Sequence, residues 1–445
     1  MILNIPRRAR WLGAGATAVL AASTAQAMPS FTRQTGSECV ACHMGGVGPQ
    51  LTPYGIRFKL GGYTDTDGKP GKVPLSARFQ VNAYNPNTGD ATTRLDQAAV
   101  LLAGRLYDNV GAMASVERNT DNTTGVTTTE LRKSDFKFAK ETKIAGRDAV
   151  VGASLNNGPG AQDPLGTLPA SGFPVVSNES RAFGQQWAHS LLSGRLANRS
   201  VGVSGFVYLD DHWYGELGHY SAMAPSTADR LFGQDPVNYP GRMHGFSPYA
   251  RMFYMQDWKT QFVTAGLVGM QSRLDTAQGG PSDKLRNVGI DFSYGFIGTR
   301  EHQVKARAVF LRERRDYGLV PAGALPSATL FESTFSANYI YRNLVGLMYA
   351  ETRTRSNNDS PFFRYFPNGQ PGAKLRFAGL YVTPWGKEDS WGAPWANVRF
   401  GIYHFKFSRF NGASSDLFGN AFVPSIPNLS ARDIGFTQIT AEVSF

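Results

Sequence analysis

Two thiols and an imidazole stand together near the start of the chain. Cys39-Val40-Ala41-Cys42-His43 reads C-x-x-C-H, the attachment sequence of c-type haem. Two thiols three positions apart can each add to a vinyl group of one porphyrin, and the adjacent imidazole can ligate the iron. A disulfide or a thioredoxin-like pair would leave His43 unexplained, and no βαβ pattern accompanies the motif. We therefore predict one covalent haem c on Cys39 and Cys42, with His43 as the proximal ligand of the haem iron.

The segment that carries this motif is short and follows an export signal. Residues 1–27 combine three arginines, an apolar stretch from Trp11 to Ala22 and the small-residue sequence Ala25-Gln26-Ala27, which predicts a signal peptide. Cleavage there lowers the formal charge from +11 to +8, since it removes three arginines and no acids. Residues 28–74 then form the predicted monohaem cytochrome c segment and linker. Fewer than 50 residues rarely bury enough surface to fold alone, so another part of the chain must enclose the haem.

The rest of the chain, residues 75–445, has the pattern of an outer-membrane β-barrel. Only 18% of residues are charged, yet past the N-terminus no apolar run is long enough for a membrane-spanning helix. Apolar and polar residues instead alternate with period two in segments of about ten residues. Clear examples lie at 75–83, 287–294, 303–310 and 331–339. The final segment, Ile439–Phe445, ends on an aromatic residue and looks like the assembly signal of bacterial outer-membrane proteins. We predict an all-β, porin-like barrel in the outer membrane of a Gram-negative bacterium, in contact with its lipid.

The number of strands follows from the lengths of the connections. A simple count gives seventeen segments, but single-chain bacterial barrels have an even number, with short inner turns alternating with long outer loops. The alternation holds if Leu196 to Ser200 is a short turn and Asp210 to His244 is one long outer loop, so that Asp211 to Ser221 is not a strand. That leaves about sixteen antiparallel strands and a lumen wide enough for a channel or a plug. We expect the haem segment to plug this lumen or its inner mouth.

The residues around the haem motif resemble a known family. The runs Met28–Gly36 and Leu51–Tyr63 are similar to the N-terminal signature of the fused outer-membrane monohaem cytochrome c–porins of iron-oxidising bacteria. Residues 44–49 and 55–57 depart from that signature. The resemblance implies an oxidoreductase that takes electrons from extracellular Fe(II) and passes them through one haem to a periplasmic c-type cytochrome. No nucleic-acid partner is expected.

The predicted outer loop contains groups that suit Fe(II). Carboxylates and imidazoles are ligands for this borderline cation, and the loop supplies Asp210, Asp211, His212, Glu216 and His219. We predict a possible Fe(II) entry site there, the alternative being an ordinary solvated loop. Two other functions stay open: a haem-plugged porin without iron turnover, and an electron conduit for a different extracellular donor or acceptor.

The second axial ligand of the haem does not stand beside the motif. No second histidine lies between residues 28 and 74, and Met44 should emerge on the wrong face. Met113 and Met255 share strand parity with polar residues, so both should face the lumen and are candidate distal ligands. Either one is alternatively a space-filling side chain. His404 has lipid-facing parity and ranks lower.

Overall fold

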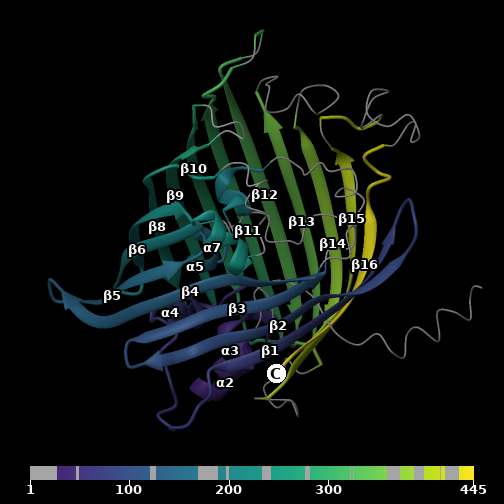
Figure 1. Cartoon of the computed structure of the whole chain (residues 1–445). Coiled ribbons are helices and arrows are strands. Elements are labelled where there is room, and N and C mark those ends of the chain that lie inside the picture. The colour runs from purple at the N-terminus through teal and green to yellow at the C-terminus, as the bar shows by residue number, and fades with distance from the viewer. Residues whose placement is uncertain are drawn as a thin grey trace, which may run out of the picture.

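A single closed β-barrel forms most of the chain. The computed structural model describes residues 28–46, 50–120, 127–168, 189–196, 200–232, 242–275, 281–320, 322–323, 325–357, 371–384, 395–410, 412–415 and 430–445. The predicted signal peptide, 1–27, lies outside these residues. Sixteen strands pair in chain order, and β1 also pairs antiparallel with β16 to close the barrel (Figure 1). The predicted barrel of about sixteen strands is confirmed.

The strands differ in length around the barrel. Their bounds are β1 Leu75–Pro86, β2 Thr92–Tyr107, β3 Val110–Thr120, β4 Thr127–Ile144, β5 Arg147–Asn156, β6 Ser200–Leu209, β7 Trp213–Ala222, β8 Ser247–Asp257, β9 Gln261–Leu274, β10 Asp283–Phe296, β11 His302–Asp316, β12 Ser327–Tyr341, β13 Val345–Ser356, β14 Ala373–Val382, β15 Asn397–Arg409 and β16 Phe436–Ser444. No helix among the described residues is long and apolar enough to cross a membrane.

The two faces of the barrel have opposite chemistry. On β10, Asn287 and Asp291 point inward and are buried, whereas Val288 and Phe292 point outward and are 60% and 49% exposed. Burial alternates in the same way along β8, β9, β11 and β12. An apolar outer face around a polar interior is the arrangement of a barrel whose wall lies in lipid.

The route of the chain through β6 to β8 differs from the prediction. Residues 213–222 form β7, which pairs with β6 and with β8, so treating Asp211 to Ser221 as loop is wrong. The predicted turn from Leu196 to Ser200 is also wrong, because residues 191–195 before it form a π-helical turn, η2 Leu191–Arg195. These two errors offset each other in the strand count. Gly215 and Gly218 interrupt the alternation of apolar and polar residues in β7. The sequence of this strand therefore resembles that of a loop.

The two ends of the barrel are unlike. Seven connections lie at one end, and six of them have at most five residues: 108–109, 145–146, 210–212, 258–260, 297–301 and 342–344. The seventh joins β14 to β15. Several of these turns use positive φ, as at Ala145, Asp210 and Arg342, which suits tight hairpins. Both chain ends enter the barrel at this end, which we call the short-turn end. The other eight connections lie at the opposite end, and they range from five residues at 87–91 to the long connection from β5 to β6.

The N-terminal helices lie at the short-turn end. They are α2 Pro29–Thr35, α3 Cys39–Cys42, the 3₁₀ turn η1 Met44–Gly46 and α4 Pro53–Leu60. In Figure 1 these purple helices lie behind the lower part of β1 and β2. Tyr63 donates to Asp135 of β4 at 2.6 Å, and Asn397 of β15 donates to the Gly46 carbonyl at 3.0 Å. The segment thus contacts inward-facing groups from both sides of the barrel seam.

One long connection folds back into the barrel. After β5 the chain forms α5 Pro159–Gln162, and residues 163–168 and η2 continue along the inner wall. Asp163 pairs with Arg251 of β8 at 3.2 Å, and the Leu191 amide donates to Glu313 of β11 at 2.6 Å. A second helix, α7 Pro225–Phe232, lies in the connection from β7 to β8. We refer to residues 157–168 and 189–196 as the inward connection.

Candidate functional site

The C-x-x-C-H motif occupies one helical turn and its exit. Cys39 to Cys42 form α3, and the His43 amide donates to the Cys39 carbonyl at 2.9 Å. Side chains three residues apart in a helix lie on the same side, so both thiols face one direction. The thiols are free, and the backbone turns extended at His43, whose side chain is largely buried. The motif therefore presents two thiols and an imidazole from one compact unit.

Helix α4 holds this unit in place by close backbone contact. A Cβ at Gly55 would lie 2.3 Å from the Cys42 carbonyl oxygen, so only glycine fits at this position. Thr52 caps α4 by accepting from the Gly55 amide at 3.2 Å, and its own hydroxyl donates to the Ala41 carbonyl. The start of α4 is thus fixed on α3 through two residues.

The environment of the thiols keeps them protonated. Burial raises the pKa of the Cys39 thiol, which lies 3.6 Å from the Thr32 hydroxyl. Burial, followed by the negative charges of Cys39 and Asp65, raises the pKa of Cys42 to about 12. Redox-active thiols of the thioredoxin type have lowered pKa values instead. Free thiols one helical turn apart beside an imidazole are the groups that attachment of a c-type haem needs.

A short antiparallel bridge supports the histidine. His43 pairs with Leu51, and the Met44 amide donates to the Gln50 carbonyl at 2.9 Å. The Met44 side chain is fully buried in an apolar cluster together with Ile56 of α4 and Ile340 of β12. The residues that flank His43 are therefore anchored to the barrel wall.

The two predicted distal ligands face the lumen but differ in their surroundings. Met255 is fully buried in the same apolar cluster as Met44 and Ile56. Met113 lies on the inner face of β3, opposite Asp135 of β4, and is only partly buried. His404 lies on the exposed outer face of β15, as its parity predicts. Of the predicted candidates, Met255 is the one that belongs to the apolar cluster that includes residues of the N-terminal segment.

A third lumenal methionine was missed by the sequence reasoning. Met348 of β13 lines a small pocket together with Gln50, seven residues after His43. It shares strand parity with the inward-facing Thr352 and Thr354, and this signal could have identified it. It is a lumenal thioether beside Gln50 and packs against the apolar cluster that contains Met44.

The predicted Fe(II) entry site is not one outer loop. Asp210, Asp211 and His212 form the β6–β7 turn at the short-turn end, where Asp211 pairs with Arg57 of α4 at 3.1 Å. Arg57 also pairs with Asp257 at the end of β8, at 3.2 Å. These acids position the N-terminal segment, on the side of the barrel opposite to the one predicted.

The other two residues of that prediction belong to β7 and point in opposite directions. Glu216 is buried in the lumen and accepts from Gln162 and Tyr214, each at 3.0 Å. His219 lies on the outward parity and stacks on Phe246, with ring centroids 4.3 Å apart. No group of three or more histidine, cysteine or acidic residues that could hold a metal ion occurs within the described ranges.

Comparison with known proteins finds likeness at the level of fold. No family model matches the chain, and no curated protein matches it. Among solved structures, the chain is similar to OmpF of Salmonella typhi in complex with daunomycin (TM-score 0.46, 10% identity, 83% of this chain and 97% of that chain). It is also similar to an anion-selective porin from Comamonas acidovorans (TM-score 0.45, 12% identity, 83% and 98%) and to OmpT of Vibrio cholerae (TM-score 0.40, 12% identity, 83% and 96%).

Proposed function

We propose that this chain is an outer-membrane electron-transfer protein that carries one covalent haem c and oxidises extracellular Fe(II). The observation that carries the proposal is the C-x-x-C-H unit with free thiols, whose neighbours Met44 and Gly46 contact the barrel wall. Cys39 and Cys42 would hold the haem and His43 would ligate its iron. When bound, the haem supplies a one-electron centre that takes up and releases charge.

The contacts of the segment support a role as a plug. Arg57 spans two turns of the wall through its ion pairs with Asp211 and Asp257. On another side, Lys59 donates to the carbonyls of Ala161 and Asp163 in the inward connection, at 2.8 and 2.9 Å. The segment therefore contacts both the wall and the connection that enters from the far end. Such filling favours passage of electrons over passage of solutes.

The position of the segment favours a periplasmic electron acceptor. In barrels of this type the short turns face the periplasm. A haem on α3 would then lie beside the inner mouth, within reach of a soluble partner. We propose that the partner is a periplasmic c-type cytochrome, and that Fe(II) delivers its electron from the outer end.

The test is reduction of the oxidised haem by Fe(II). In purified outer-membrane vesicles that carry the full chain, the haem absorbance should shift to the reduced spectrum on mixing with Fe(II). The Cys39→Ala/Cys42→Ala double variant should carry no covalent haem after denaturing electrophoresis and should show no such shift. Absence of covalent haem from the wild-type protein would reject the proposal. Reduction of the haem by other donors but not by Fe(II) would reject Fe(II) as the donor and keep the electron-transfer role.

A haem-plugged porin is the competing function, and conductance distinguishes the two. In planar lipid bilayers the full chain should pass far less current than an open porin of sixteen strands, because the segment and the inward connection occupy the lumen. Porin-like conductance of the haem-loaded protein would favour the porin.

A further inference from the structure

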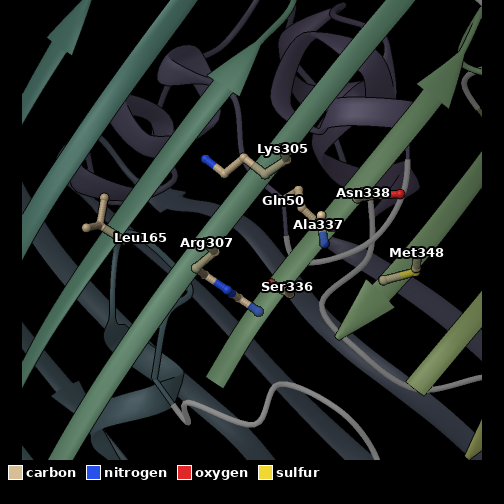
Figure 2. Close-up of a pocket in the computed structure, with 8 residues that line it drawn as sticks. All are labelled: Gln50, Leu165, Lys305, Arg307, Ser336, Ala337, Asn338 and Met348. Atoms are coloured by element: carbon tan, nitrogen blue, oxygen red, sulfur yellow. The ribbon is translucent and has the colours of Figure 1, made fainter. Parts of the chain in front are cut away.

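The small pocket beside Gln50 is bounded by three separate parts of the molecule. The N-terminal segment contributes Gln50, the inward connection contributes Leu165, and the wall contributes residues of β11, β12 and β13. Figure 2 shows Lys305 and Arg307 of β11 alongside Ser336 and Asn338 of β12. The pocket therefore lies where the segment, the connection and the wall meet.

Two buried cations line this pocket, and the acids whose charge reaches Arg307, Asp163 and Asp291, already pair with Arg251. Lys305 and Arg307 are 8% and 7% exposed, and neither forms an ion pair with any carboxylate in the part of the chain that the structure describes. Arg307 donates to the Gly166 carbonyl at 2.7 Å, but its Nε is buried without a hydrogen-bond partner. The Lys305 ammonium lies 4.1 Å from the centre of the Phe262 ring.

Other lumenal cations show the contrast. Lys137 pairs with Asp135 at 2.6 Å, and Arg399 pairs with Glu442 at 3.0 Å. A buried charge without a counter-charge is costly, and two like charges on alternate residues of one strand add repulsion. Arg251, Arg307 and Lys305 together face two acids, Asp163 and Asp291, and neither acid pairs with Lys305. This excess of one positive charge can be met by an anion that is not part of the polypeptide. The Gln50 amide and the Ser336 hydroxyl add uncharged donors to the lining.

We infer that this pocket is a carboxylate site that receives the propionates of the haem, an inference that rests on the proposed covalent haem. The Gln50 carbonyl accepts from the Met44 amide, so the pocket begins next to the iron ligand His43. A haem carries its vinyl groups and its propionates on different edges of the ring. A porphyrin joined to Cys39 and Cys42 therefore directs its carboxylates away from α3.

The pairing has a consequence for the redox chemistry. Cations that compensate the propionate charges make the electrostatic potential at the iron less negative. This favours the reduced state of the haem. Loss of either cation should therefore lower the reduction potential of the haem. It should do so without removing the thioether bonds, which involve only Cys39 and Cys42.

The experiment is an optical redox titration of the full haem-loaded protein in detergent. Lys305→Met and Arg307→Gln should each change the Fe(III)/Fe(II) equilibrium constant about tenfold toward Fe(III). For one electron this lowers the midpoint potential by about 59 mV. Lys305→Arg should restore the wild-type potential. Arg312→Gln, an exposed cation on the same strand, is the matched control and should leave the potential unchanged. Folding of each variant is checked by electrophoresis, in which the boiled sample should migrate more slowly than the unboiled sample of the same variant.

The outcomes separate the inference from the proposed function. Unchanged potentials in both variants, with haem still attached, would overturn the propionate site and leave the proposed function intact. Absence of covalent haem in the wild type would overturn both. Replacing chloride by inorganic phosphate at constant ionic strength should not move the wild-type potential. A phosphate-dependent fall that Lys305→Met abolishes would show a site for free anions and would overturn the propionate assignment.

Discussion

At the scale of single residues, the absence of a side chain at Gly55 controls how α4 meets α3. Gly55→Ala would place a methyl group 2.3 Å from the Cys42 carbonyl oxygen, and overpacking of this kind costs about 1–3 kcal/mol. We expect α4 to shift away from α3 and the N-terminal segment to become more sensitive to limited proteolysis. Gly205→Ala, with only the Gly152 carbonyl oxygen at 3.9 Å, is the control and should match the wild type. Equal resistance of the two variants would contradict the close contact.

Lys59 provides a pH-dependent prediction at the same scale. Burial first, and then the neighbouring Lys137, lowers the pKa of the Lys59 ammonium to about 8, against 10.5 for an exposed lysine. Above pH 8 the folded state binds fewer protons than the unfolded state, so stability of the docked segment should rise with pH. The slope is at most about 1.4 kcal/mol per pH unit.

The measurement for Lys59 is resistance of the segment to proteolysis between about pH 8 and pH 9. The haem-loaded chain is used, because free thiols at Cys39 and Cys42, whose pKa values are raised by burial, would oppose the effect in this range. Above this range the tyrosines oppose it, because burial raises the pKa of Tyr54 to about 12. In the wild type, the resistance of the N-terminal segment to proteolysis, relative to that of a barrel loop, should increase between about pH 8 and pH 9. In Lys59→Met it should not change with pH. A flat wild-type profile would show that Lys59 does not titrate there.

At the scale of elements, the inward connection is held by a buried ion network. Arg251 of β8 contacts Asp163 of the connection and Asp291 of β10, and all three side chains are inaccessible to solvent. Asp163→Ala leaves Arg251 with one partner fewer and removes the acceptor of the Thr167 and Leu168 amides. Breaking a buried pair of this kind costs about 3–5 kcal/mol.

We expect Asp163→Ala to loosen the connection and to raise single-channel conductance in planar bilayers. The control is Arg286→Gln, which removes an exposed ion pair with Asp316 at the outer end and should leave the conductance unchanged. Identical currents in both variants would mean that the network does not hold the connection in the lumen.

The elements also show what the sequence could predict. β10, β11 and β12 alternate strictly, with Val288 and Phe292 outside and Asp291 inside, so their pattern alone identifies them. β7 has glycine at 215 and 218, and its inward face carries Tyr214 and Glu216, so no apolar face is apparent. The inward connection has no such signal, since it depends on acids such as Asp163 meeting strands far away in sequence. The C-x-x-C-H motif could be recognised because its chemistry lies within five residues.

At the scale of the whole molecule, the N-terminal segment depends on the barrel for its polar contacts. Tyr63, Lys59 and Arg57 all reach partners more than seventy residues away. Residues 28–74 expressed alone with the haem-attachment machinery should therefore lack a native-like, six-coordinate, low-spin spectrum. The spectrum of the full chain in detergent is the reference. A soluble fragment with the same spectrum would show that the segment needs neither the wall nor a ligand from it.

The β1–β16 seam also sets an order of events during biogenesis. Those two strands come from opposite ends of the barrel sequence, and their pairing from Arg78↔Ser444 to Pro86↔Phe436 completes the cylinder. Residues 28–74 directly precede β1, and Asn397, near the final strands, donates to the Gly46 carbonyl of this segment. In the proposed function, attachment of haem to Cys39 and Cys42 by a periplasmic enzyme would therefore precede closure of the seam. The precursor would reach the outer membrane as a partly matured chain, carrying its cofactor before it has a wall.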